Sequence, residues 1–156
     1  MNKIDARLSE LGIELPSPPA PRAARILMAK IAGDFLFVSG QLPSWNGELR
    51  YVGKVGKEFD LAQTQAAGRL SALNVLAQAR GALGGDLDRI AEVVGLRGYV
   101  NTTPEFFEIA QAVNGASDLM VEVFGTAGAH TRTALGVAMM PYNAVIEVDA
   151  QFLLKK

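Results

Sequence analysis

The chain has 156 residues, a formal net charge of −1, a single histidine and no cysteine. Without cysteine it can form no disulfide bond, thiolate nucleophile or thiolate metal site. A single histidine also excludes sites that need two imidazoles from one chain. Basic and acidic residues number 15 and 16, with no basic block. This balance argues against nucleic acid as a ligand, because phosphate binding requires a positive surface.

Length and composition predict one soluble domain that spans residues 1–156. The hydrophobic fraction of 49% is high for a chain of this size. Surplus apolar surface on a small domain is commonly buried against another subunit, so we expect an oligomer. The first residues contain charges rather than an apolar signal stretch, and no run approaches the roughly 18 apolar residues of a membrane span. We therefore expect a cytoplasmic protein.

An N-terminal extension, residues 1–25, has two parts. Apolar residues at helical spacing predict a short helix over residues 2–11, which Gly12 ends. Four prolines then fall within residues 16–21. They predict an extended segment that lies over a surface, because proline has no N–H to donate within a sheet.

Strands are predicted to follow the extension. Residues 26–31 and 35–38 have the composition of two strands joined by a short turn. The second has apolar residues on both faces, which is typical of a central strand covered on both sides. Asn46-Gly47 favours a hairpin turn that leads into a strand over residues 49–55.

The first long helix has clear signals at both ends. Asp60 and Gln63 have the spacing of a capping box and predict its start, and Gly84-Gly85 predicts its end. Its apolar face is predicted to contain Ala66, Leu70, Leu73 and Leu76.

A second long helix is predicted to begin at Thr103-Pro104, an N-cap followed by proline at the first helical position. It is expected to be interrupted near Asn114-Gly115 and to end at Gly125.

Three more strands complete the pattern, over residues 93–101, 133–140 and 144–153, with a turn at 141–143 between the last two. This order of elements predicts an α+β fold, in which a single mixed sheet carries both long helices on one face. The other face of such a sheet is uncovered, which again predicts an oligomer.

Arg132 is the first candidate binding residue. Alternation along its strand places Arg132, Ala134 and Gly136 on one face. One long cation among small residues is typical of a pocket for a small anion, and a guanidinium matches a carboxylate with two parallel hydrogen bonds. The alternative is a solvated arginine, or one in a structural ion pair, at the edge of a strand.

Glu147 and Asp149 share a face of the last strand. A two-residue loop at the turn would place Glu147 on the same face as Arg132, whereas a three-residue loop would place it on the opposite face. A partly buried carboxyl can act as a general acid or base, although a polar outer strand face explains the same pattern. Two carboxylates are weak grounds for a metal site, and none is predicted. His130 has no serine in a strained elbow to pair with, which argues against a catalytic triad.

Four blocks of sequence resemble one family. They are Phe37-Val38-Ser39-Gly40-Gln41-Leu42-Pro43, Ala72-Leu73-Asn74, Val113-Asn114-Gly115, and the stretch from Arg132 to Glu147. In this order and spacing they resemble the Rid family of reactive-intermediate deaminases, also called YjgF-like or L-PSP endoribonuclease-like proteins. The resemblance covers about residues 16–152. The N-terminal helix and proline segment resemble a longer subgroup of that family.

The resemblance implies a chorismate-mutase-like fold and a homotrimer with clefts between subunits. It also implies hydrolysis of enamines and imines to 2-oxo acids and ammonia, without a metal or cofactor. Glu147 matches the residue associated with the attacking water and proton transfer, and Arg132 matches the one that binds the substrate carboxylate. Ser39 and Gly40 match residues that line the cleft, and Asn114 matches a nearby polar residue.

The chain departs from the founding branch at four positions. Ile26 occupies the place of a tyrosine, Ala134 that of a cysteine and Met139 that of an arginine. His130 stands where a small residue or proline is usual, and could serve as a substitute polar group at the mouth of the cleft.

The leading hypothesis is a hydrolase that acts on imines or enamines of small amino acids. The second is a non-catalytic or regulatory trimer that holds a small carboxylate in the same pocket. The third is an endoribonuclease, against which the charge balance and the single histidine argue.

Overall fold

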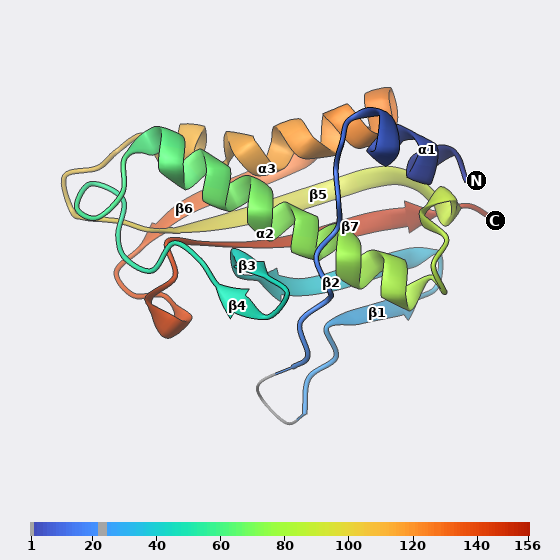
Figure 1. Ribbon diagram of the computed structural model, residues 1–156, viewed down its shortest axis with the longest axis horizontal. Helices are drawn as coiled ribbons and strands as arrows, with labels where there is room; N and C mark the ends of the chain where they lie inside the picture. The colour runs from blue at the N-terminus through green and yellow to red at the C-terminus, as the bar shows by residue number, and fades with distance from the viewer. Residues whose placement is uncertain (1, 22–24) are drawn as a thin grey trace.

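The computed structural model describes residues 2–21 and 25–156, which form a mixed five-stranded sheet with two long helices on one face (Figure 1). The strand order is β1-β2-β7-β5-β6. The strands are β1 (Ala29–Ala32), β2 (Phe35–Gln41), β5 (Ile90–Asn101), β6 (Thr131–Val137) and β7 (Ile146–Leu154). Neighbouring strands are antiparallel except β5 and β6, which are parallel. The predicted α+β class and its layers are confirmed.

The helices α2 (Leu61–Ala82) and α3 (Ile109–Phe124) lie side by side over the sheet (Figure 1). The capping box that begins α2 is confirmed: the Gln63 backbone N–H donates to the Asp60 carboxylate at 2.8 Å, and the Asp60 N–H donates to Gln63 Oε1 at 3.0 Å. After α2, Gly84 and Gly85 both have positive φ, as expected for glycines that end a helix.

Of the four residues predicted on the apolar face of α2, Leu76 is fully buried and Leu73 packs against the core, Leu70 is half-buried, and Ala66 is exposed, so the prediction was wrong at Ala66. The buried face also carries many small residues, among them Ala67, Gly68, Ser71 and Ala72. Small residues allow α3 to approach closely: a Cβ on Gly115 would overlap the backbone carbonyl of Gln65. Helix packing, rather than bulk hydrophobicity, selects this face.

The start of α3 was also predicted wrongly. The helix begins at Ile109, because the Thr103 N–H donates to Val55 O at 3.1 Å and ties the preceding segment to a loop. The expected interruption near Asn114 is absent, and α3 runs without a break to Gly125. Gly115 within α3 is explained by the close contact between α3 and α2 rather than by a break in the helix.

A short hairpin of β3 (Ser44–Trp45) and β4 (Glu48–Leu49) surrounds Asn46 and Gly47, whose positive φ confirms the predicted turn. The strand expected over residues 49–55 is absent, because β4 ends after two residues. Tyr51 and Gly53 have positive φ, which breaks the extended backbone and turns the chain across the end of the sheet.

The last two strands do not pair with each other, since β5 lies between them. They are joined through η3 (Pro141–Asn143), a turn in which Tyr142 and Asn143 have φ of 56°. Alternating patterns identify the face on which a side chain lies but not the neighbouring strand.

One face of the sheet is uncovered in the single chain. Strand β2 has neighbours on both sides, but Phe35 and Phe37 are 41% and 42% exposed. The expectation that both faces of this strand are covered was therefore wrong for one subunit. Leu135 of β6, 51% exposed, lies on the same open face.

The described part of the N-terminal extension packs on the domain through α1 and the segment up to Pro19 (Figure 1). The helix α1 (Lys3–Glu10) begins at the Asp88 carboxylate, which accepts the backbone N–H groups of Lys3 and Ile4 at 2.7 Å each. The proline segment then crosses α2 without regular secondary structure, as predicted. Residues 22–24 lie outside the described residues. No helix in the described ranges is both long and apolar enough to cross a membrane.

Candidate functional site

The residues singled out from sequence lie in two clusters on opposite faces of the sheet. Arg132 is in register with Leu96 of β5, and Glu147 is in register with Tyr99. Because side chains alternate along a strand, these two β5 positions point to opposite faces, and so do Arg132 and Glu147. A single chain does not bring them together.

The first cluster, here called the carboxylate half-site, consists of Gly40, Glu147 and Ile26. Strand β2 has a bulge between Val38 and Gln41, which places Gly40 directly against the Glu147 carboxylate. A Cβ at position 40 would overlap that carboxylate, so the position requires glycine.

The bulge is held by the side chain of Gln41, which is 1% exposed. Its Nε2 donates to Ser39 O at 2.9 Å and to Gly40 O at 3.3 Å. Ser39 in turn donates its hydroxyl to Leu27 O at 2.7 Å, so its side chain fixes the segment that enters β1. Ser39 therefore lies beside the half-site with its hydroxyl hydrogen already donated.

Burial and the negative charge of Asp149 both raise the pKa of Glu147. Asp149, unlike Glu147, has an ion-pair partner: Arg97 Nε lies 2.9 Å from Asp149 Oδ1. This bond raises the pKa of Arg97. Within the described residues Glu147 has neither an ion pair nor a hydrogen bond. A half-buried carboxyl whose pKa is raised can both accept and return a proton.

A cavity of about 310 Å³ adjoins Glu147. Gly40 and Ile26 line it, together with residues from the hairpin, from the turn before β7 and from the proline segment. Ile26 therefore lines the same cavity as Glu147, at the position where the resemblance implies a tyrosine.

The second cluster, here called the arginine half-site, is built on α3 and the start of β6. Arg132 Nη1 donates to Asn114 Oδ1 at 2.9 Å and to Ser117 Oγ at 3.1 Å, and Nη2 donates to Ala110 O at 3.1 Å. The Nε–H and one Nη2–H donate to no group among the described residues. Two such donors are sufficient for a bidentate contact with a carboxylate.

His130 is half-buried and bonded at both ring nitrogens rather than solvated. Nδ1 lies 2.6 Å from Gly128 O, and Nε2 lies 2.9 Å from Ser117 Oγ. A carbonyl can only accept, so Nδ1 carries the proton, and in the neutral ring Nε2 accepts from the Ser117 hydroxyl. His130 thus supports Ser117, which contacts Arg132. Ser117 was not predicted from the sequence, where its only signal is its spacing of three residues after Asn114.

The small residues beside Arg132 have a different role from the one predicted. A Cβ on Gly136 would lie 2.7 Å from Ile109 Cδ1, and one on Gly98 would lie 2.6 Å from Val113. These glycines make room for α3 against the sheet, and the guanidinium of Arg132 is held by residues of that helix.

Residues 5–152 match the family model described as YjgF/chorismate mutase-like, putative endoribonuclease. The chain belongs to this family, the Rid family. Its fold is accordingly the chorismate-mutase-like one.

Several Rid family relatives match the chain over almost its whole length. Protein TCP17 of Trypanosoma cruzi is 44% identical over 149 residues, which cover 95% of this chain and 92% of that protein. The crystal structure of Atu1372 from Agrobacterium tumefaciens, a protein of unknown function, is 43% identical with a TM-score of 0.90, covering 98% of this chain and 93% of that one. A protein from Shewanella oneidensis described as a putative endoribonuclease is 36% identical with a TM-score of 0.93, covering 98% and 100%.

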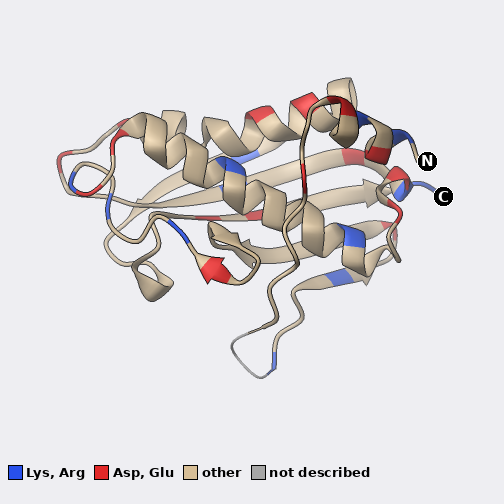
Figure 2. Ribbon diagram, viewed as in Figure 1, with Lys and Arg blue, Asp and Glu red and all other residues tan. Residues whose placement is uncertain are grey.

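The other departures from the founding Rid branch lie close to Arg132 in sequence. Ala134 is half-buried on the same face of β6, and Met139 is 85% exposed in the turn after that strand. No group of three or more His, Cys, Asp or Glu side chains in the described part of the chain is arranged to hold a metal ion. Figure 2 shows basic and acidic residues interspersed along the chain.

Proposed function

We propose that the protein hydrolyses imines or enamines of small amino acids to 2-oxo acids and ammonia, in a cleft formed by two subunits. The observation that carries this proposal is the pairing of Gly40 with Glu147. The bulge sets an unpaired, half-buried carboxyl beside a cavity, which is the arrangement an acid–base group requires.

Assembly as a homotrimer would join the two half-sites. Glu147 lies on the uncovered face, where Phe35, Phe37 and Leu135 are exposed. Arg132 lies on the edge strand β6. A closed ring uses two different surfaces of each copy, so the edge of one subunit can meet the open face of the next. Each of the three clefts then contains Glu147 from one copy and Arg132 from another.

In this cleft the substrate carboxylate binds the two remaining donors of Arg132. Glu147 accepts a proton from a water molecule as its oxygen attacks the imine carbon. The same carboxyl returns this proton to the nitrogen to give a carbinolamine. It then accepts the hydroxyl proton of the carbinolamine and passes it to the amino nitrogen, so that the carbon–nitrogen bond breaks and ammonia leaves a 2-oxo acid. One imine and one water give one 2-oxo acid and one ammonia, and a raised pKa suits Glu147 to these proton transfers.

A distant protein of the same fold supports a small carboxylate as the ligand. Escherichia coli TdcF, 19% identical with a TM-score of 0.61, is described with bound serine. Binding without turnover is the second candidate function, favoured by Ile26, which places no hydroxyl beside Glu147. The interspersed charges of Figure 2 give no support to an endoribonuclease.

The test is the hydrolysis of imines generated in situ by an amino-acid oxidase or a threonine dehydratase, followed as 2-oxo acid and ammonia. We expect acceleration over the spontaneous rate, and a loss of about 10²–10⁴-fold in Glu147→Gln. No acceleration across several amino acids would contradict hydrolysis. Saturable binding of a 2-oxo acid that is lost in Arg132→Ala would then identify a binding protein.

A further inference from the structure

The cavity beside Glu147 has mostly apolar walls, and Gln41, Ser44 and Tyr142 are the neutral polar side chains in its described lining. Ile26, Met28, Leu42 and Leu49 contribute aliphatic side chains, and Glu147 is the only charged residue among the described residues that line it. Its volume of about 310 Å³ is at the lower end of the range for small-molecule pockets. This volume is larger than a two- or three-carbon acid needs, and leaves room for a substrate side chain.

The first wall belongs to the N-terminal extension, where Pro19 and Ala20 line the cavity. Two hydrogen bonds hold this segment: Gln78 Nε2 donates to Pro19 O at 2.7 Å, and the Ser17 N–H donates to Asn46 Oδ1 at 2.8 Å. Gln78 is only 9% exposed, so a largely buried amide directs its donor to this segment. Prolines restrict φ, so the wall is ordered before a ligand arrives.

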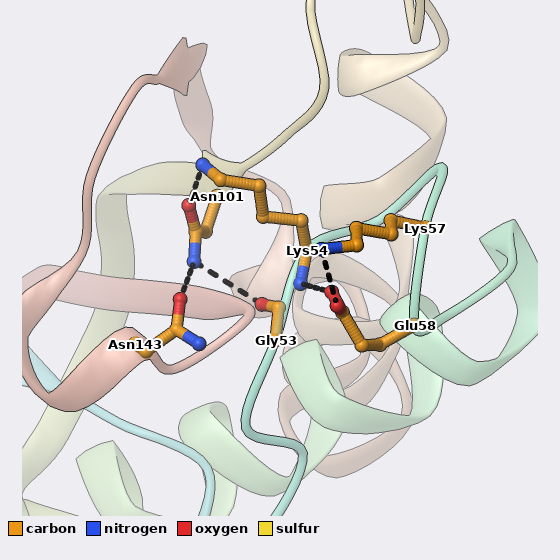
Figure 3. A network of polar contacts seen from close by, with 6 residues as sticks. All are labelled: Gly53, Lys54, Lys57, Glu58, Asn101 and Asn143. Atoms are coloured by element: carbon orange, nitrogen blue, oxygen red, sulfur yellow. Dashed lines mark hydrogen bonds and ion pairs between the residues drawn. The ribbon is translucent and has the colours of Figure 1, made fainter.

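The opposite wall is the turn before β7, where Tyr142 lines the cavity. Figure 3 shows how Asn101 holds this turn: its Nδ2 donates to Asn143 Oδ1 at 3.0 Å and to Gly53 O at 3.1 Å. Lys54 Nζ donates to Asn101 Oδ1 at 2.7 Å, and Asn101 is fully buried. This network fixes a turn whose backbone has positive φ at two positions.

We infer that this cavity receives the side chain of the substrate and selects imines of aliphatic amino acids of about leucine or methionine size. The inference rests on the proposed function, because Arg132 of another copy would hold the carboxylate while the side chain enters the cavity. The N-terminal extension is then part of the binding site.

Charge and exposure both favour an aliphatic side chain. The side chain of Ile26 is 51% exposed. An apolar substrate group that covers Ile26 would bury apolar surface on both sides of the contact, which is favourable. A hydroxyl on the substrate would lose hydration in a mostly apolar cavity, where, among the described lining residues, only Gln41, Ser44, Tyr142 and Glu147 offer polar side chains. An acidic side chain would lie beside Glu147, whose like charge would repel it.

The experiment compares kcat/KM for imines generated in situ from leucine, methionine, alanine, serine and glutamate. We expect leucine and methionine to exceed alanine and serine by about tenfold or more, since a buried methylene group is worth about that factor in an apolar pocket. Glutamate is expected to be the poorest substrate.

Two variants test which walls are responsible. Ile26→Ser should reduce the ratio of leucine to alanine several-fold, and Gln78→Ala should also reduce it by releasing Pro19. The matched control is Val52→Ser: Val52 is a β-branched residue of similar exposure, 50%, outside this cavity. It should leave the ratio unchanged.

Failure of this inference is distinguishable from failure of the proposed function. Equal kcat/KM for leucine, alanine and serine would overturn the inference while hydrolysis stands. If no imine is hydrolysed, calorimetric binding of 4-methyl-2-oxopentanoate, pyruvate and 2-oxoglutarate decides the matter. Tighter binding of 4-methyl-2-oxopentanoate, weakened by Ile26→Ser, supports the pocket, and equal or weaker binding overturns it.

Discussion

The two half-sites are built by opposite physical means. Glu147 is positioned by backbone: a bulge and a glycine bring β2 against it, and no described side chain neutralises it. Arg132 is positioned by side chains and a carbonyl on α3, which use three of its five donors. A group that must exchange protons is left without a partner, whereas a group that must keep a fixed charge is held by hydrogen bonds.

The prediction with the largest expected effect concerns whether Glu147 of one subunit and Arg132 of another form one active site. Arg132→Ala and Glu147→Gln should each abolish imine hydrolysis. Trimers that contain both variants should recover about a third of the wild-type rate, because one of their three clefts then combines an intact Glu147 with an intact Arg132. The measurement is the activity of co-expressed, doubly tagged oligomers. No recovery would place the whole site within one chain.

Gly40→Ala should disrupt the carboxylate half-site alone. The new Cβ would displace the Glu147 carboxylate, so activity should fall as far as in Glu147→Gln, with a destabilisation of about 1–3 kcal/mol from overpacking. The control is Gly81→Ala in α2, where a Cβ meets nothing within 4 Å and helix propensity gains up to about 1 kcal/mol. Undiminished turnover in Gly40→Ala would show that the β2 bulge is not needed for activity.

Glu147→Gln should stabilise the fold at neutral pH, by about 0.5–2 kcal/mol. The pKa of Glu147 is raised in the folded state, so its ionised form is disfavoured there relative to the unfolded chain. This penalty is absent below the unfolded pKa, grows as the pH rises from the unfolded to the folded pKa, and is constant above the folded pKa. Denaturant unfolding at pH 4 and pH 8 should therefore show the variant's advantage only at the higher pH. Glu92→Gln, at an exposed position of β5, should show none.

Ser117→Ala should weaken the arginine half-site without removing it. The variant loses one of the three hydrogen bonds that hold Arg132, and His130 Nε2 loses its partner. Because substrate binding is weakened rather than the chemical step, KM should rise several-fold with little change in kcat. His130→Ala should have a smaller effect in the same direction. Ser9→Ala, at an exposed position of α1, is the control, and a fall in kcat alone for Ser117→Ala would contradict a positioning role.

The sequence predicted correctly those structural features that depend on contacts between neighbouring residues. The capping box at Asp60 and the glycines after each long helix lie as expected, because each depends on backbone groups within a few residues. Errors arose where distant contacts decide. Thr103 has the pattern of an N-cap, but its N–H pairs with Val55 on another segment.

The site was predictable only in part for the same reason. Alternation correctly placed Glu147 and Asp149 on one face of the last strand, but it could not show that β5 separates that strand from Arg132. Ser117 and the apolar walls of the cavity come from segments distant in sequence, which no local pattern connects.

The bulge in β2 has a consequence for inheritance. The strand pairs regularly with β1 and β7 over residues 35–38, before the bulge, so this pairing does not depend on the extra residue. Loss of one codon there would restore regular pairing and remove the setting of Glu147, while the core and the open face stayed as they are. A single deletion at the bulge could therefore remove catalytic activity from a descendant of this protein and leave its fold intact.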